Sequence, residues 1–299
     1  MQTSSIAQGQ PKMQQLDILI LGAGWTSTFL IPLLKVKNFN FAATTKDGRE
    51  VASHKTIKWS FNPDSTEDSD LASLPLAQHV LITFPLTSVA QTDFLVSKYI
   101  STHTPHATET RFVQLGSTGI WQIPQKMQWV SRHSPYNITN PRAIAEDALL
   151  KHSGCVLNLA GLWGGEREPR TWVDRVATTK EAVRSKKSLH MIHGLDVSRA
   201  IVAVMGNWYS AKGERWMLTD GFVYDWWALF AGWADVKAQG GKDDAEVESE
   251  PSKQAKWVYE CMLEEKVWAL PRSMGALERC YFGREFWDTF QLAPVKARI

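Results

Sequence analysis

Short apolar runs alternate with amphipathic stretches along most of the chain. The first run, Leu16–Leu21, is mostly apolar and rich in isoleucine, which is typical of a buried parallel strand. A helix-like stretch follows it and reaches Leu34. This alternation predicts a Rossmann-type, doubly wound α/β sheet of about seven parallel strands with helices on both faces. Seven later runs are candidates for the other strands: Phe39–Ala43, Thr56–Ser60, His79–Phe84, Arg111–Leu115, Cys155–Leu159, Ser188–Ile192 and Arg215–Leu218.

A glycine-rich turn follows the first predicted strand directly. Gly22 permits a tight turn, and Gly24 lets a pyrophosphate approach the backbone. Trp25 and Thr26 then begin a helix, whose free N–H groups and positive dipole end attract phosphates. The third glycine of the usual G-x-G-x-x-G pattern is replaced by Ser27. The turn predicts a dinucleotide site, and the alternative is a strand-to-helix turn that binds no ligand.

The end of the second predicted strand indicates which dinucleotide the site prefers. Thr44, Thr45 and Lys46 come first, and Arg49 is close by. A cation here accommodates a ribose 2′-phosphate, whereas an acidic residue at the strand end would hold a 2′-hydroxyl. Because Asp47 comes late and belongs to a turn, the pattern favours NADP(H) over NAD(H). The alternative is a solvated polar loop.

The end of the fourth predicted strand should lie close to the same cofactor. The carboxyl ends of parallel strands meet at one crevice, which is where ligands bind in open α/β sheets. We therefore expect Phe84 and Pro85, which end this strand, to lie near the cofactor.

The remaining pattern divides the chain into a core and a smaller lobe. Residues 1–15 are expected to be a disordered tail, residues 16–162 a dinucleotide-binding core and residues 163–299 a mixed α/β substrate-binding lobe. A strand and a helix at 188–205 should return to the core, with Asp196 capping that helix. Glycines and an acidic run predict an exposed loop or lid over Gln239–Lys256. Three further helices are predicted: Val89–Ile100, Pro141–Lys151 and Trp257–Glu265.

Composition narrows the classes of function. The 299 residues carry a formal net charge of +2 with both signs interspersed, which argues against a nucleic-acid surface. Cys155, Cys261 and Cys280 lie far apart without metal-site spacing, as is typical of buried thiols in a reducing compartment. Residues 1–15 lack the apolar core of a signal peptide, and no apolar run reaches membrane-spanning length. We expect a cytoplasmic monomer or homodimer without metal, nucleic-acid or membrane partners.

Tryptophan is unusually frequent, with 14 residues. Large rings of this kind pack cores, and the alternative is an aromatic-lined pocket for an apolar or flat ligand. Many of them come late in the chain: Trp208, Trp216, Trp226, Trp227, Trp233, Trp257, Trp268 and Trp287.

Four stretches together resemble the extended short-chain dehydrogenase/reductase superfamily, in its atypical NAD(P)-dependent epimerase branch. Beside the glycine turn Gly22–Trp25, the stretch Gly116–Trp121 looks like the Ser-Ser-x-x-Val-Tyr-Gly segment of epimerases. The stretch Leu159–Gly164 is similar to their Arg-x-x-x-Val-Tyr-Gly segment, and Met191–Ala200 is similar to their His-Val-x-Asp-Val-Ala-x-Ala element. The tryptophan-rich last third looks more like a fungal-type offshoot. The four stretches are Gly22–Trp25, Gly116–Trp121, Leu159–Gly164 and Met191–Ala200.

The resemblance implies a catalytic serine and a Tyr-x-x-x-Lys pair, which this chain matches only in part. Ser117 falls on the serine position, and Thr118 follows it. Tyr136 is the nearest tyrosine, but the residue four positions later is Asn140. Arg142 falls where the lysine would be, and arginine is a poor proton relay because its pKa stays above about 12. Either Tyr136 reaches the site from a displaced position, or the usual relay is lost.

Three functions are compatible with these residues. The resemblance implies an NADP(H)-dependent reductase or epimerase acting on a small, apolar organic molecule. The altered relay favours a non-redox isomerase, cyclase or lyase of specialised metabolism on the same scaffold, for which Ser117, Thr118, Tyr136 and Arg142 are the candidate polar groups. It also allows a sensor that binds NADP(H) and reports its level to a protein partner.

Overall fold

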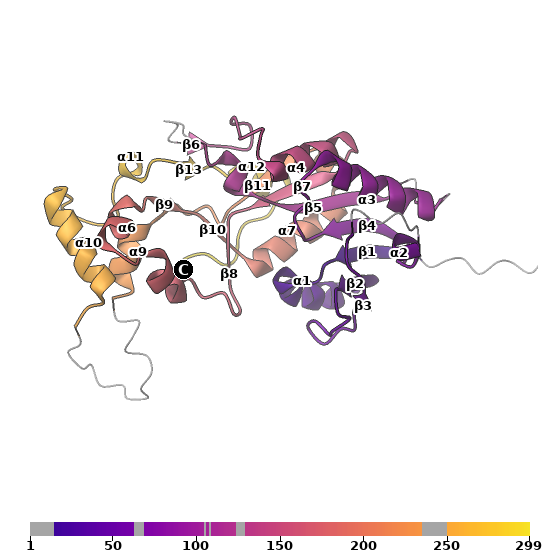
Figure 1. The fold of residues 1–299 in the computed structure, drawn as a ribbon, viewed down its shortest axis with the longest axis horizontal. Helices are drawn as coiled ribbons and strands as arrows, with labels where there is room; N and C mark the ends of the chain where they lie inside the picture. Colours follow the sequence, from indigo (N-terminus) through magenta and orange to yellow (C-terminus); the bar gives the residue numbers. More distant parts are fainter. Residues whose placement is uncertain (1–14, 63–68, 105, 108, 124–128, 235–249) are drawn as a thin grey trace, which may run out of the picture.

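Seven strands form one parallel sheet, as predicted (Figure 1). The computed structural model describes residues 15–62, 69–104, 106–107, 109–123, 129–234 and 250–299. The sheet order is β11-β7-β5-β4-β1-β2-β3, and every neighbouring pair is parallel. Its strands are β1(Leu16–Leu21), β2(Phe41–Thr45), β3(Ile57–Lys58), β4(Ala77–Ile82), β5(Arg111–Ser117), β7(Cys155–Leu159) and β11(Arg215–Leu218).

Helices cover both faces of this sheet because successive side chains of a strand point to opposite sides. Ile18 and Ile20 of β1 belong to one apolar core, and Leu19 and Leu21 belong to another. The first core includes α1(Trp25–Val36) and α7(Gly194–Gly206), and the second includes α2(Ser69–Ala72), α3(Val89–Thr102) and α4(Pro141–Lys151). The doubly wound α/β fold is therefore confirmed.

The strand order reverses between β1 and β4, and this reversal positions the site. The chain runs from β1 outward to β2 and β3, then returns to pair β4 with the other side of β1. The helices that follow β1 and β4 consequently leave toward opposite faces of the sheet. A crevice opens at such a switch point, outside the carboxyl ends of the strands.

A third apolar core holds the C-terminal helices together at the end of the molecule away from the sheet (Figure 1). Trp226, Trp227 and Trp233 are buried in it, with Trp257 packed against them, so these tryptophans fill a core. Trp268, in contrast, is 89% exposed. The helices of this part are η2(Pro169–Trp172), α5(Val173–Val176), α6(Lys180–Ser185), α9(Trp226–Gly232), α10(Lys253–Glu264) and α11(Met274–Leu277).

A buried ion pair fixes the start of α9. Asp225 and Arg272 are both buried, with 2.6 Å between Asp225 Oδ1 and Arg272 Nη2. Asp225 also accepts a hydrogen bond from the Trp227 N–H and so caps the helix, while the Arg272 guanidinium stacks on the Trp227 ring at 4.0 Å. Each charge is satisfied by several partners, as burial requires.

Short two-stranded pairs and helices connect the sheet with this third core. β10 pairs with β8, β12 with β9, and β13 with β6. The elements not yet given are η1(Thr118–Trp121), β6(Trp129–Val130), β8(Gly161–Trp163), β9(Ser188–Leu189), β10(Met191–His193), α8(Trp208–Ala211), β12(Tyr224–Asp225), β13(Cys280–Tyr281) and α12(Arg284–Thr289).

The expected role of Asp196 was wrong. The helix begins at Gly194, three residues before the start that a cap at Asp196 implies, and the His193 side chain caps it by accepting from the Leu195 N–H. Asp196 is buried and accepts from the N–H groups of Val295 and Lys296, near the chain's end. These hydrogen-bond donors lie about a hundred residues from Asp196 along the chain, so the local sequence pattern could not predict the contact.

Two other expectations need revision. The strand predicted over 188–192 is split into β9 and β10, which pair with different partners. Residues 253–256 of the predicted loop belong to α10, and 239–249 lie outside the described residues.

Burial of His190 predicts that the fold weakens in acid. His190 Nε2 accepts from the Tyr281 N–H at 2.9 Å, and burial lowers the pKa of His190 from 6.5 to about 3. Between pH 6.5 and about 3, His190 therefore binds a proton in the unfolded chain but not in the folded one. The free energy of unfolding consequently falls as pH decreases below 6.5. His190→Gln keeps an acceptor but cannot titrate. We expect wild type to lose about 1.4 kcal/mol per pH unit relative to this variant below pH 6.5. Urea denaturation from pH 7 to 4.5 measures this difference, and equal slopes would contradict it.

Candidate functional site

A cavity of about 880 Å³ opens at the carboxyl ends of four neighbouring strands. Its size suits a cofactor or drug-sized ligand. The walls come from segments after β1, β2, β3 and β4, with two residues from β8 and the loop after it. The lining residues are Gly22–Thr26, Thr45–Asp47, Arg49, Trp59–Phe61, Thr83–Pro85, Thr87, Gln91, Leu162 and Arg167.

Thr44 holds the glycine turn in shape from the neighbouring strand. Its hydroxyl accepts from the Gly22 N–H at 3.0 Å, and its carbonyl accepts from the Ala23 N–H at 2.6 Å. Gly22 has φ +86°, a backbone conformation that favours glycine. The Thr83 hydroxyl donates to Leu21 O at 3.0 Å and also to Gly22 O. The N–H groups of Gly22 and Ala23 are therefore already hydrogen bonded within the protein.

The next three amides are open. No described residue accepts a hydrogen bond from the N–H of Gly24, Trp25 or Thr26, and no side chain caps α1. A Cβ built on Gly24 would meet only Gly22 O, at 3.9 Å, so its free side faces the cavity. Three unsatisfied donors at a helix N-terminus, beside an uncovered glycine, form a cradle suited to an anion such as a phosphate.

Aromatic side chains form the wall at the ends of β3 and β4. Phe84 stacks on Phe61 with ring centroids 5.4 Å apart, and Trp59 lies 6.3 Å from Phe84. Pro85 continues this wall. Such flat apolar surfaces suit an aromatic base.

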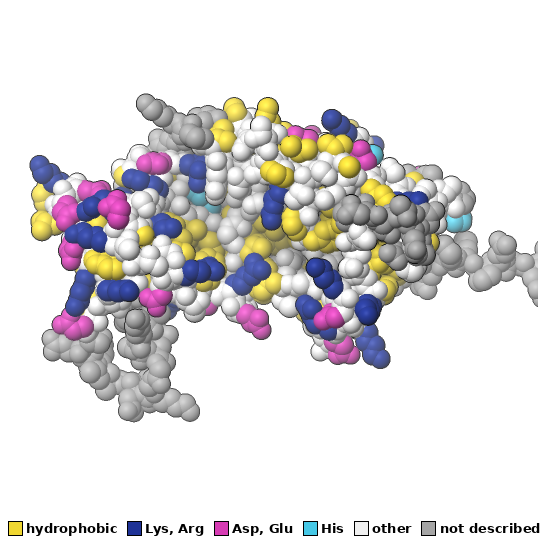
Figure 2. All heavy atoms as spheres, in the orientation of Figure 1, with side chains coloured by type: hydrophobic (Ala, Val, Ile, Leu, Met, Phe, Trp, Pro, Cys, Tyr) yellow, Lys and Arg dark blue, Asp and Glu magenta, His cyan; other side chains and the backbone are white. Residues whose placement is uncertain are grey.

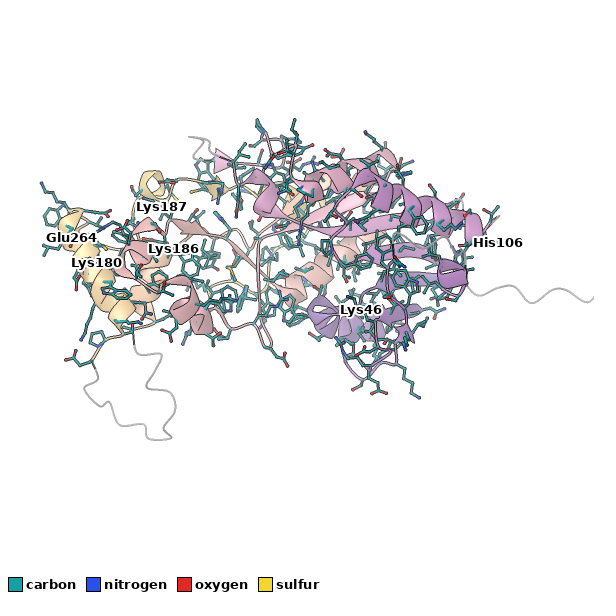
Figure 3. The ribbon with its side chains drawn as sticks, viewed as in Figure 1. Lys46, His106, Lys180, Lys186, Lys187 and Glu264 are labelled. Carbon is teal, nitrogen blue, oxygen red and sulfur yellow. The ribbon has the colours of Figure 1, made fainter. Side chains whose placement is uncertain are left out.

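Polar and charged residues form the rim at the end of β2. The Thr45 hydroxyl accepts from the Gly48 N–H and bonds to Thr56, so it shapes the loop. Arg49 pairs with Asp47 at 3.3 Å, and the pKa of Asp47 is lowered, chiefly by the Arg49 N–H. The Lys46 side chain, next to α1 and β2 in Figure 3, has no hydrogen bond or ion pair to any described residue. Lys46 is therefore an uncommitted cation at the cavity.

Among the charged residues of the lining, Arg167 is the one that the sequence pattern missed. Its guanidinium lies over the Trp25 ring, 4.4 Å from the centroid. Trp25 in turn donates from Nε1 to Gly164 O at 3.1 Å. Arg167 belongs to a highly charged stretch with no motif, so only the fold brings it to the glycine turn.

The four candidate catalytic residues lie outside the lining of this cavity. The Ser117 hydroxyl accepts from the Gly119 N–H, and the Thr118 hydroxyl donates to Leu159 O at 3.3 Å. The Tyr136 hydroxyl donates to Asp147 Oδ1 at 2.8 Å. The Arg142 side chain is exposed, and its own N–H is capped by Asn140.

Tyr136 belongs to a buried polar network between α4 and the sheet. Arg215 stacks on the Tyr136 ring at 4.4 Å and pairs with Asp147 at 2.9 Å. Glu146 is fully buried, and burial raises its pKa, although Asn158 donates to both of its oxygens. The network satisfies the Tyr136 hydroxyl within the protein.

Other kinds of site are not found in the part of the chain that the structure describes. Its His, Cys, Asp and Glu side chains form no group of three or more that could hold a metal ion. None of its helices combines the length and the apolar character needed to cross a membrane.

Fold and cavity together define a Rossmann-type α/β protein with an anion cradle after its first strand. No family model and no curated protein sequence matches the chain. Solved structures share the fold at low identity. A conserved protein of unknown function from Silicibacter pomeroyi has a TM-score of 0.61 at 14% identity, covering 95% of both chains.

Two similar structures carry the names of enzymes. Vestitone reductase from alfalfa (Medicago sativa) has a TM-score of 0.55 at 15% identity, over 83% of this chain and 98% of its own. A UDP-galactose 4-epimerase has a TM-score of 0.59 at 11% identity, over 94% of each chain. These likenesses agree with the epimerase-like fold expected from the motifs.

The two glycines of the turn should respond differently to substitution. Gly22→Ala places a Cβ 3.0 Å from Phe84 and Thr83 at a φ of +86°, so we expect a loss of about 1–3 kcal/mol. Gly24→Ala enters open space at an ordinary φ of −115° and should cost less than about 1 kcal/mol. Urea denaturation followed by circular dichroism measures both, and equal losses would contradict the geometry.

Proposed function

We propose that this protein binds NADP(H) and acts as a reductase or epimerase, similar to short-chain dehydrogenases, on a small apolar organic molecule. One observation carries the proposal: the open N–H groups of Gly24, Trp25 and Thr26 face a cavity at the switch point of the sheet. The reductase and the epimerase among the similar structures support the same class of activity.

The cavity fits the parts of a dinucleotide. The three amides would hold the pyrophosphate, and Gly24 leaves the room that a close approach requires. Phe84 and Pro85 would contact the flat base, and Lys46 would meet a ribose 2′-phosphate. When bound, a nicotinamide cofactor supplies a hydride donor or acceptor.

An apolar substrate is supported by the surface beside the sheet. Hydrophobic side chains gather in a hollow between the sheet and the C-terminal helices, and Lys and Arg side chains lie around it (Figure 2). Apolar clefts of this kind are where small organic ligands bind.

Lys46→Ala tests the choice of cofactor. If the Lys46 ammonium meets the 2′-phosphate, its removal should weaken NADP⁺ about tenfold and leave NAD⁺ unchanged. Isothermal titration calorimetry with both nucleotides measures this. Lys37→Ala, an exposed lysine just beyond α1 and outside the cavity lining, is the matched control.

The outcomes separate two claims. Equal weakening of both nucleotides would mean that Lys46 does not read the 2′-phosphate. Binding of neither nucleotide to wild type would overturn the proposed function.

A non-redox catalyst is the second candidate. It is favoured by the contacts of Tyr136, whose hydroxyl donates to Asp147 while its ring lies against Arg215, and by the exposed side chain of Arg142. An isomerase, cyclase or lyase needs a shaped pocket and a few polar groups but no moving hydride. A cofactor sensor would share these contacts and would need different affinities for NADP⁺ and NADPH.

Tyr136→Phe distinguishes these functions. If Tyr136 is the proton donor of the proposed reductase, the variant should lose about 100-fold in turnover while NADPH binding is unchanged. The assay follows NADPH fluorescence with a panel of ketones and enones. Tyr209→Phe, at a side chain that is 96% exposed, is the control.

Two results would argue against proton transfer by Tyr136 in a redox reaction. Unchanged turnover would exclude Tyr136 as the proton donor. Bound NADPH that no substrate consumes would favour the non-redox catalyst, or the sensor if the oxidised and reduced cofactors bind with different affinities.

A further inference from the structure

The loop after β8 forms a small rigid turn that faces the glycine turn. Gly164 and Arg167 exchange two backbone hydrogen bonds, of 2.9 and 3.1 Å. Gly164 has φ +105° and Gly165 has φ +57°, so the turn uses two left-handed positions. A Cβ on Gly164 would come within 2.2 Å of the His193 ring, so the turn is packed tightly on its inner side.

Aromatic rings connect this turn to the start of α1. Trp25 and Phe29 meet edge to face at 5.0 Å, Phe29 meets His193 at 5.2 Å, and His193 meets Trp163 at 4.7 Å. Arg167 completes the series by stacking on Trp25. The guanidinium is therefore held against the first residue of the helix whose amides are open, which reduces the ordering cost of binding.

The positive charge of Arg167 has no ionic partner among the described residues. Its guanidinium has no hydrogen bond or ion pair to any described residue, yet it lines the cavity with Gly24 and Trp25. Of the four charged side chains in the lining, Asp47 and Arg49 pair with each other. Lys46 and Arg167 remain as two cations without an ionic partner among the described residues, and they come from separate parts of the chain.

We propose that Arg167 is a binding residue for the diphosphate of the nucleotide, which it holds against the open amides from the opposite side of the cradle. The proposal rests on the proposed nucleotide-binding function and adds a phosphate-contacting side chain from outside the glycine turn. A planar guanidinium suits phosphate oxygens because it offers several donors in a fixed fork. No described residue accepts a hydrogen bond from the guanidinium, so its N–H donors remain available.

Arg167→Ala tests the proposal with ADP and adenosine as probes. We expect ADP to bind about tenfold more weakly to the variant and adenosine to bind as in wild type, because adenosine has no phosphate. Arg167→Lys should be intermediate, since lysine keeps the charge but not the planar fork. Arg170→Ala is the matched control, an exposed arginine in the adjacent η2 that does not line the cavity.

Calorimetry at two salt concentrations gives a second readout. The affinity of wild type for ADP should fall with added salt more steeply than that of Arg167→Ala, because the variant has lost one phosphate-facing charge. Unchanged ADP affinity in Arg167→Ala would overturn the role of Arg167 while leaving the nucleotide function intact. Absence of ADP and NADP⁺ binding to wild type would overturn both.

Discussion

The hydrogen bonds between Thr44 and the glycine turn govern the rest of the site. Strand β2 brings Thr44 beside the end of β1, where its side chain and carbonyl take the N–H groups of Gly22 and Ala23. These hydrogen bonds hold the turn in shape, and the following N–H groups have no acceptor among the described residues. An isolated helix start leaves its first amides to water. Here these amides face a cavity that is built from the ends of four parallel strands, so a bound anion can replace that water.

The group of helices around Trp226, Trp227 and Trp233, away from the sheet, depends on a different kind of interaction. Its tryptophans pack around α9 and α10, and the buried pair of Asp225 and Arg272 sets where α9 begins. A buried ion pair adds little net stability but is costly to break, because one charge would be left without a partner. The pair therefore keeps α9 in register with the segment that carries Arg272. The apolar hollow beside the sheet has one of its walls in this lobe.

Much of the core could be predicted because its signals are local. All seven sheet strands overlap the short runs that predict them, and the helix Pro141–Lys151 has the predicted bounds. Strand ends shifted by a few residues because pairing, rather than the apolar run, decides where a strand stops; β2 extends to Thr45 through its pairing with β3. Asp196 and Arg167 could not be assigned in the same way. Each acts on a segment far away in the chain, and neither belongs to a local pattern.

The sequence by itself determined the sheet, the glycine turn and the polar character of the rim at β2, because period, glycine placement and charge are properties of neighbouring residues. Only the tertiary structure decided which groups remain free. It ties the Tyr136 hydroxyl to Asp147 and pairs Arg49 with Asp47, while Lys46 and Arg167 at the cavity have no ionic partner in the part of the chain that the structure describes. The physical reason is that a hydrogen bond or ion pair depends on distance in space, and the fold sets that distance between residues that are far apart along the chain.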